Sequence, residues 1–178
     1  MPRLNTDTKT EIKAVALELF AANGIDRTSL REIAERLGIT KAALYYHFAS
    51  KAELLTDLVR PLIDDLAAFR DEAKANAADR PRDVLEGYFD LCHRHRLLFQ
   101  VLLRDASVVG QVGMLGELLH ARGELDAVMV GSREPVDRVR SVVAFGGIQD
   151  CIALYPDAPA DTIRAAVVDA AYRALVPG

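Results

Sequence analysis

The sequence contains no tryptophan, few aromatic residues and only two cysteines. Aromatic residues make up 6% of the 178 positions, but hydrophobic residues make up 51% and charged residues 27%, so a packed core can form and global disorder is excluded. The longest stretch without Asp, Glu, Lys or Arg runs for 11 residues, from Ala106 to Gly116, too short to span a bilayer. The first ten residues lack the apolar core of a signal peptide. With Cys92 and Cys151 as its only cysteines, the chain is expected in a reducing cytoplasm.

Charge is divided unevenly along the chain. The net charge is −4, which taken alone argues against a nucleic-acid partner. Residues 1–51, however, carry 8 Lys and Arg against 6 Asp and Glu, a net +2, whereas residues 52–178 carry 14 against 20, a net −6. This mild asymmetry fits a basic head on an acidic body.

Apolar residues recur at helical spacing, with no strand-like alternation, and predict an all-α protein. Three motifs of the capping-box type, beginning at Thr8, Ser29 and Ser50, predict helix starts in the first third of the chain. Gly24 and Gly38 predict helix ends. The remainder predicts helices over about 81–95, 97–104, 118–130, 135–155 and 160–175.

The stretch 29–51 has the spacing of a helix-turn-helix unit. Ala34 lets two helices cross closely, Gly38 supplies the positive φ of the turn, and Leu44 fills the angle between the helices. The groove-facing set of the second helix, about 41–47, is then Thr40, Lys41, Ala42, Ala43, Tyr45 and His47. Phosphate contacts are predicted for Tyr45, His47, Lys51, Thr28 and Ser29. The same spacing occurs in helical proteins that bind no DNA, so spacing alone leaves both interpretations open.

Two blocks of sequence carry a resemblance. Residues 33–55 read IAERLGITKAALYYHFASKAELL, and residues 16–25 read ALELFAANGI. The first block resembles the DNA-binding signature of the TetR family of bacterial transcriptional regulators, and the second resembles the first helix of that family. The resemblance covers about the first 60 residues. It implies a three-helix DNA-binding head with a helix-turn-helix at 1–60, and a C-terminal helical bundle for ligand binding and dimerisation at 61–178.

The resemblance also implies a homodimer that binds a palindromic double-stranded DNA operator, and a small-molecule effector that releases it. By position, Thr40, Lys41, Ala42 and Tyr45 would lie in or beside the groove, His47 and Lys51 would touch phosphate, and Leu44, Tyr46 and Phe48 would be structural. The sequence departs from many family members in having alanine at both 42 and 43. Methyl contacts to thymine would then carry more of the readout.

Small and apolar residues of the body, residues 61–178, predict a ligand cavity and a dimer interface. A ligand cavity is expected to be lined by Tyr88, Phe89, Cys92, His95, Phe99, Leu103, Met114, Leu118, Phe145 and Gln149, with an entrance at 107–116. A four-helix dimer interface is expected to use Val143, Gly147, Ile163, Ala166, Val167, Ala170 and Ala174. A filled core, and faces that pack only within one subunit, are the alternatives. A helix from Ser50 to about 75, bent at Pro61, would couple body to head.

No catalytic arrangement of residues stands out, so a non-enzyme without a cofactor is expected. Cys92 and His95 lie one turn apart, but without a second cluster they do not close a tetrahedral metal site. The expected function is a ligand-responsive transcriptional repressor, although the sequence does not separate a repressor from an activator. The alternatives are a helical small-molecule-binding protein or enzyme whose head does not read DNA, and a general nucleoid-like binder.

Overall fold

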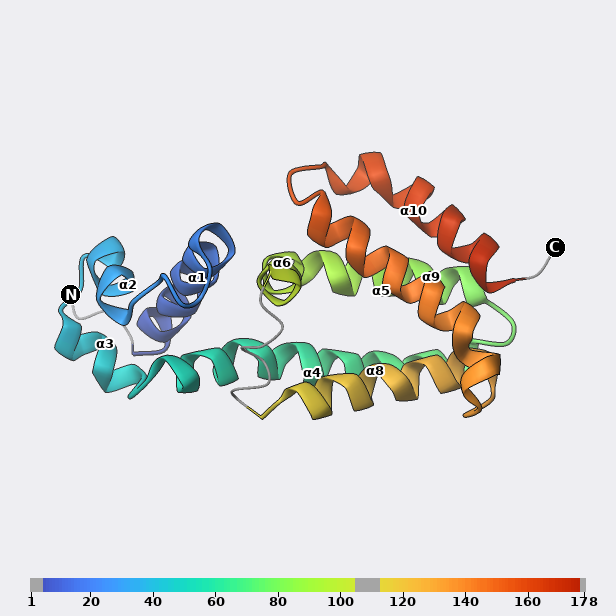
Figure 1. The fold of residues 1–178 in the computed structure, drawn as a ribbon, viewed down its shortest axis with the longest axis horizontal. Coiled ribbons are helices and arrows are strands. Elements are labelled where there is room, and N and C mark those ends of the chain that lie inside the picture. The colour runs from blue at the N-terminus through green and yellow to red at the C-terminus, as the bar shows by residue number, and fades with distance from the viewer. Residues whose placement is uncertain (1–4, 105–112, 177–178) are drawn as a thin grey trace.

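The computed structural model describes residues 5–104 and 113–176, which form nine α-helices and no strand. The predicted all-α class is confirmed. The molecule is elongated, with α1, α2 and α3 grouped at one end and the remaining helices forming a layered body at the other (Figure 1). None of the helices in these ranges combines the length and the hydropathy that crossing a bilayer requires.

The head is formed by α1 (Asn5–Asn23), α2 (Leu30–Leu37) and α3 (Lys41–His47). The apolar positions predicted from helical spacing meet in one core, where Ile12, Phe20 and Ile33 are fully buried. Residues of this core come from all three helices because each helix is short and buries a single face. Burial of that face stabilises helices that would not be stable in isolation.

Two of the three predicted capping boxes need correction. The helix predicted to start at Thr8 begins at Asn5, so Thr8 lies inside α1. Ser50 does cap α4, because its hydroxyl accepts a hydrogen bond from Glu53 N–H, but the Glu53 carboxylate accepts from Ala49 N–H at 2.8 Å. The box at Ser29 is complete and is described with the candidate interface below.

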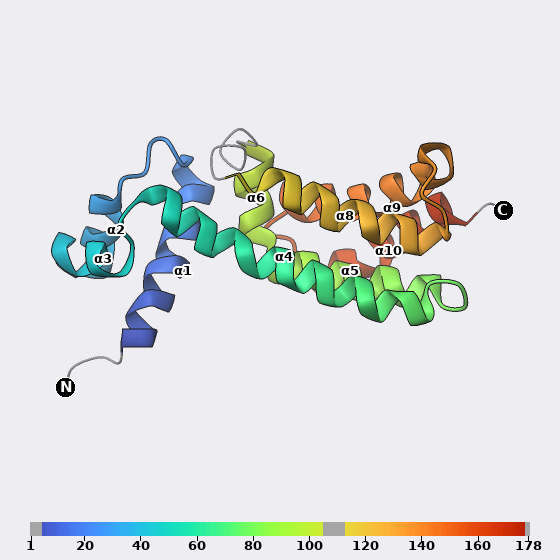
Figure 2. The ribbon, with the colours of Figure 1, turned by 90° about the horizontal axis from the view of Figure 1, so that it is seen from below.

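The longest helix, α4 (Lys51–Asn76), runs from the head along the body (Figures 1 and 2). It continues through Pro61, an exposed residue at which the sequence predicted a bend. Its first buried residues, up to Leu58, belong to the head core, and from Val59 onward they belong to the body core. One helix therefore contributes side chains to both cores.

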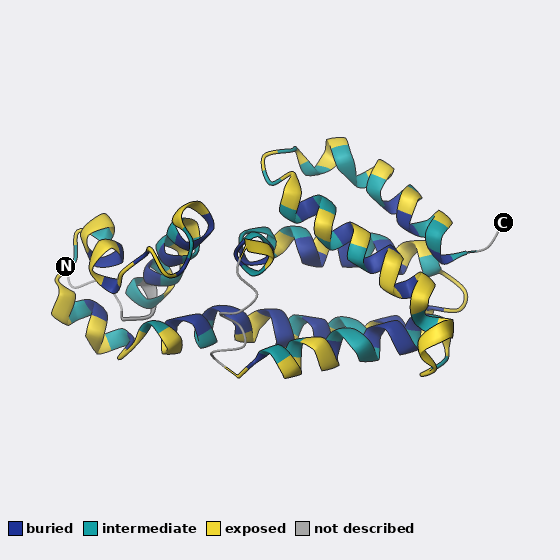
Figure 3. Ribbon diagram, in the orientation of Figure 1, coloured by how far each residue is buried: buried dark blue, intermediate teal, exposed yellow. Residues whose placement is uncertain are grey.

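The body adds α5 (Pro81–Arg94), α6 (Arg96–Arg104), α8 (Leu115–Val130), α9 (Pro135–Leu154) and α10 (Ala160–Leu175). The predicted ranges agree, except that α8 starts three residues before the expected 118. Helix α4 packs on α5 and α8, while α9 packs on α5, α8 and α10. Figure 3 shows exposed residues along the outer sides of α9 and α10.

Helix α6 contributes to both cores. Leu98 and Phe99 are buried in the body core, whereas Val101 is buried in the head core. The head is thus held by α6 as well as by α4. The sequence predicted this connection through α4 alone, because the contact of α6 with α1 is formed by residues more than eighty positions apart.

Candidate nucleic-acid interface

The turn between α2 and α3 is fixed by backbone hydrogen bonds. Gly38 has φ 66°, in the left-handed region that favours glycine. Its N–H donates to Glu35 O at 3.1 Å, and Ile39 N–H donates to Ala34 O at 3.0 Å. Leu44 from α3 is completely buried against α2. These contacts hold α3 at a fixed angle to α2, which is the geometry of a helix-turn-helix.

The exposed face of α3 consists of small, hydroxyl and cationic residues. Thr40 caps the helix by accepting a hydrogen bond from Ala43 N–H at 3.1 Å. Lys41 and Ala42 are exposed, and Tyr45 is 43% exposed. Lys41 Nζ lies 5.4 Å from the centroid of the Tyr45 ring, close enough for a cation–π contact. Ala43 and His47 are half-buried and lie at the margin of this face.

Thr28 does not present its hydroxyl to the surface, so the phosphate contact predicted for this residue cannot use that group. The side chain is 1% exposed. Its hydroxyl hydrogen bonds to Gly24 O at 2.9 Å and to Leu19 O at 3.3 Å. These hydrogen bonds tie the start of α2 to the end of α1 and the loop that follows it. They also give the buried hydroxyl the partners that buried polar atoms need within a protein.

Lys51 is also used within the head. Its ammonium donates to Ile25 O at 2.8 Å and to Thr28 O at 3.1 Å. Two of the three N–H groups of this lysine therefore donate hydrogen bonds to carbonyls of the α1–α2 loop. The structure thus gives Lys51 a structural role, and the phosphate contact predicted for it stays a prediction.

We expect Lys51→Met to lower the free energy of unfolding by about 1–2 kcal/mol, because two loop carbonyls lose a charged donor. Urea unfolding measures the change, and exposed Lys41, changed to Met, serves as the control with little effect on stability. An unchanged stability, combined with a salt slope of DNA binding lower by about 1, would instead restore the phosphate contact.

The start of α2 is occupied by the side chain of Glu32. Ser29 N–H donates to the Glu32 carboxylate at 2.7 Å, and the Ser29 hydroxyl accepts from Glu32 N–H at 3.2 Å. The hydrogen bonds from Ser29 lower the pKa of Glu32, so the carboxylate stays ionised at this helix end. A phosphate would have to compete with that carboxylate for the Ser29 N–H, which weakens the prediction for Ser29.

Tyr46 was expected to be structural, and the structure corrects this assignment. The side chain is 77% exposed, whereas its neighbour Phe48 is 1% exposed and lies in the head core. The Tyr46 ring meets His47 edge-on, with centroids 5.4 Å apart. Tyr46 is one position beyond Tyr45 on α3, so both tyrosines are available at the surface of the head.

Most residues predicted for the ligand cavity meet in the body core. Tyr88, Phe89, Cys92, Phe99, Met114 and Phe145 are all buried in it, and Leu118 packs against it. Leu103 is 52% exposed, so it does not line an interior cavity as predicted. Gln149 is half-buried on α9. The predicted entrance at 107–116 lies mostly outside the described residues.

His95 lies in a polar cluster with Asp65 and Arg94, between α4 and the end of α5. Its Nε2 lies 2.8 Å from Asp65 Oδ2, and Arg94 Nη1 donates to the same oxygen at 3.0 Å. Burial would raise the pKa of Asp65, but the hydrogen bonds from His95 and Arg94 lower it overall. Cys92 points into the core instead, and no group of three metal-ligating side chains occurs in the described ranges.

A buried charged cluster between α8 and α9 was missed by sequence analysis. Asp126 is 3% exposed and accepts a hydrogen bond from the Ser141 hydroxyl at 2.7 Å. Arg122, one turn earlier on α8, forms an ion pair with the same carboxylate. Arg138 Nη2 lies 3.8 Å from Asp126 Oδ2 and donates to Gly123 O at 2.8 Å. The sequence signal was an arginine and an aspartate four positions apart on α8.

The predicted dimer face has exposed small residues on both C-terminal helices. Val143 is 57% exposed, and Gly147, Ala166 and Ala170 are exposed. Ile163, Val167 and Ala174 are half-buried against their own body core. Between α9 and α10 lies an apolar hollow of about 180 Å³, lined by Val143, Ala144, Gly147, Cys151, Val167, Ala170, Ala171 and Ala174.

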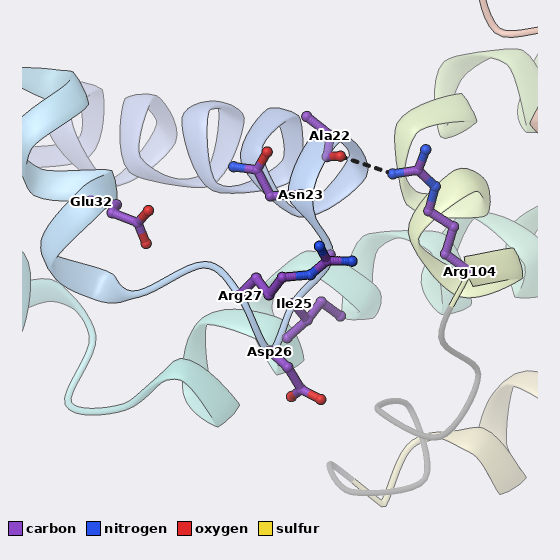
Figure 4. A pocket seen from close by; sticks show the side chains of 8 residues that line it. Ala22, Asn23, Ile25, Asp26, Arg27, Glu32 and Arg104 are labelled. Carbon is purple, nitrogen blue, oxygen red and sulfur yellow. Dashed lines mark hydrogen bonds between the residues drawn. The ribbon is translucent and has the colours of Figure 1, made fainter.

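Arg104 ties the end of α6 to the end of α1. Its guanidinium donates hydrogen bonds to Ala21 O and to Ala22 O. Figure 4 shows the bond to Ala22, which is 3.0 Å long. These carbonyls lie at the C-terminus of α1, where a cation is favoured by the helix dipole. A polar hollow of about 730 Å³ adjoins this contact and is lined partly by Asn23, Arg27 and Glu32. Arg104 is therefore a direct polar contact between body and head.

Residues 12–58 match the family model described as "Bacterial regulatory proteins, tetR family". The HTH-type transcriptional regulator TtgR of Pseudomonas putida is 34% identical over 131 residues, which are 72% of this chain and 56% of the relative. The HTH-type transcriptional regulator AcrR of Shigella flexneri is 30% identical over 118 residues, 61% of this chain and 54% of the relative. The chain thus spans about half the length of the curated relatives it matches.

Solved structures share the fold over nearly the whole chain. A transcriptional regulator from Aquifex aeolicus superposes with a TM-score of 0.74 at 21% identity, covering 92% of this chain and 96% of that chain. A TetR-family regulator from Streptomyces coelicolor superposes with a TM-score of 0.71 at 24% identity, covering 94% and 90%. At this identity the likeness concerns the fold alone.

Proposed function

We propose that this chain, whose residues 12–58 belong to the TetR family of bacterial regulatory proteins, is a ligand-responsive repressor that binds a palindromic operator as a homodimer. The observation that supports DNA reading most directly is the exposed face of α3. It presents Thr40, Lys41, Ala42 and Tyr45 on a helix that Leu44 fixes against α2. Small side chains at the centre of such a face let the helix enter a major groove.

Readout of sequence would come from few groups. Lys41 is the cation at the start of α3, where recognition helices contact base edges, and its ammonium suits the acceptors of guanine. The methyl group of Ala42 suits the thymine methyl. Tyr45, Tyr46 and His47 follow on the same helix and would contact the backbone at the groove edge. Thr28 and Lys51 leave the proposed set because their polar groups are engaged within the head.

Dimerisation would place two copies of α9 and α10 against each other. Val136, Val139 and Val143 expose more than half of their side-chain area on α9, and Ala166 and Ala170 are exposed on α10. Small residues let the helix axes approach closely, and the apolar hollow between the two helices would receive side chains of a second copy. The two heads must then lie about 34–36 Å apart to reach successive major grooves.

The effector would act by changing that separation. The body core surrounds Tyr88, Phe89 and Phe145, and α4 and α6 contribute side chains both to this core and to the head core. A ligand that binds one arrangement of these helices more tightly lowers operator affinity by its differential affinity for the two arrangements. Arg104 on α6 and the continuous helix α4 give such a movement a direct path to the head.

Selection of binding sites from random duplex DNA tests the proposal. We expect the parent protein to enrich a palindrome, and Lys41→Ala to relax the preference at one base pair per half-site by about 1–3 kcal/mol. Ala75→Ser, at an exposed position on α4 remote from α3, is the control that leaves the motif unchanged. Salt-dependent binding to DNA without an enriched motif would indicate a general nucleoid-like binder. No binding to DNA would indicate a small-molecule-binding protein or enzyme whose head does not read DNA.

A further inference from the structure

Arg122 carries a positive charge into the body core. Its side chain is 14% exposed and extends over a floor of two aromatic rings. Its Cζ atom lies 4.8 Å from the centroid of Phe145 and 5.7 Å from that of Tyr88. The two rings contact each other edge-on at 4.5 Å. Ring faces attract a guanidinium, but a ring face does not take the hydrogen bonds of its in-plane N–H groups.

The ion pairs of this region leave an excess of positive charge. Asp126 is the carboxylate that faces Arg122, and it also accepts from Ser141 and lies 3.8 Å from Arg138. Two guanidiniums therefore share one buried carboxylate. Arg122 Nε is buried and finds no hydrogen-bond partner among the described residues. A buried N–H of a charged group without an acceptor is costly, so it points to a partner outside the chain.

Tyr88 supplies a second buried donor at the same place. Its side chain is 0% exposed, and Arg122 and Cys92 are its polar neighbours, but no described group lies in hydrogen-bond geometry to Oη. Burial raises the pKa of Tyr88 well above its usual value, and burial also raises the pKa of the neighbouring Cys92 thiol. Both groups stay neutral and can donate. The site thus holds buried N–H and O–H donors, on Arg122 and Tyr88, that no acceptor among the described residues satisfies.

We propose that Arg122 Nε–H and Tyr88 Oη–H bind a carboxylate of the effector, whose apolar remainder packs into the surrounding body core. This inference rests on the proposed ligand-binding function of the body. A carboxylate supplies acceptor oxygens for both donors and balances the excess charge of Arg122, Arg138 and Asp126. A cationic effector would add to that excess, and an alcohol would leave it in place.

The surrounding core can adapt to an apolar group. Met114 and Met129 belong to the same buried core as Tyr88 and Phe145. Unbranched methionine side chains change rotamer at low cost and fill irregular spaces. Because the acid-binding donors come from α5 and α8, and α8 packs on α4, the ligand would act on the helix that carries the head.

The test uses the full chain and matched probes. Decanoate, 1-decanol and decylamine share a chain, and 4-phenylbutanoate, 4-phenylbutanol and 4-phenylbutylamine add an aromatic version. Binding is measured by isothermal titration calorimetry and by the shift in melting temperature. We expect at least one carboxylate to bind about 10-fold or more tighter than its alcohol, which corresponds to one charge-assisted hydrogen bond, and the amines to give no shift.

Two conservative variants assign the binding to the named atoms. Tyr88→Phe keeps the ring and removes the hydroxyl, and Arg122→Lys keeps a charge for Asp126 and removes Nε–H. We expect each to weaken the carboxylate about 10-fold and to leave alcohol binding unchanged. The melting temperature of Tyr88→Phe without ligand should equal or exceed that of the parent, because an unpartnered hydroxyl is removed. Tyr172→Phe on α10 and Arg140→Lys, at an exposed position of α9, are the controls that retain carboxylate binding.

Equal binding of a carboxylate and its alcohol, or no carboxylate binding at all, would overturn the inference. Carboxylate binding at the parent level in Tyr88→Phe would also overturn it, and this isosteric variant keeps the test decisive if Arg122→Lys does not fold. Site selection with the same protein separates this result from the proposed function. An enriched palindrome without carboxylate binding refutes the ligand class alone, whereas carboxylate binding without a palindrome refutes DNA reading alone.

Discussion

Ala170→Glu is expected to convert the proposed dimer into monomers and to weaken operator binding about 100-fold or more. Ala170 is exposed on α10 and lines the apolar hollow shared with Val143 and Gly147 of α9. In a twofold dimer the change places two carboxylates in one apolar interface. Neither carboxylate finds a cation among the residues that line this hollow, so each would be buried without a partner.

The loss of operator affinity follows from the loss of linkage between the heads. Two linked heads bind a palindrome more tightly than one, because the second binding step is intramolecular. Light scattering after size-exclusion chromatography measures the mass, and a gel shift with the selected palindrome measures affinity. Ala75→Glu, an equivalent change at an exposed position of α4, should remain dimeric and bind the operator. An intact dimer in Ala170→Glu would place the interface elsewhere.

Leu44→Ala is expected to unfold the helix-turn-helix while the body stays folded. Leu44 is completely buried between α3 and α2, and truncating such a leucine costs about 2–5 kcal/mol. The head core is small, so this loss is comparable with its whole stability. The body core contains none of the same side chains, and its helices keep their packing. Operator binding should be lost completely.

Hydrogen exchange separates the two parts of the molecule. We expect protection to disappear in α2 and α3 of Leu44→Ala and to persist in α5 and α9. Tyr46→Ala is the matched control, because Tyr46 is two positions away on the same helix and is 77% exposed. It should keep the stability of the parent, and any decrease in operator affinity would then report a DNA contact. Protection of α2 and α3 at the parent level in Leu44→Ala would show that the angle between these helices does not depend on Leu44.

Local sequence patterns predicted the helix ranges and the helix-turn-helix well. The range of α3, its cap at Thr40 and the glycine turn at Gly38 were all expected from spacing, because caps and turns depend on residues within one helical turn. The complete capping box at Ser29 has the same origin. By contrast, the box expected at Thr8 failed, because a short motif does not prevent a helix from extending beyond it.

The sequence by itself determined the all-α fold class, the helix-turn-helix and its resemblance to a DNA-binding family, because periodicity and turn chemistry are local. Only the tertiary structure decided that Thr28 and Lys51 support the α1–α2 loop and that Tyr46 faces outward. It alone also brought Tyr88 of α5 beside Arg122 of α8. The partner of a side chain depends on which helices pack together. Helical periodicity predicts which face of a helix is buried, but it does not predict which helix packs against that face.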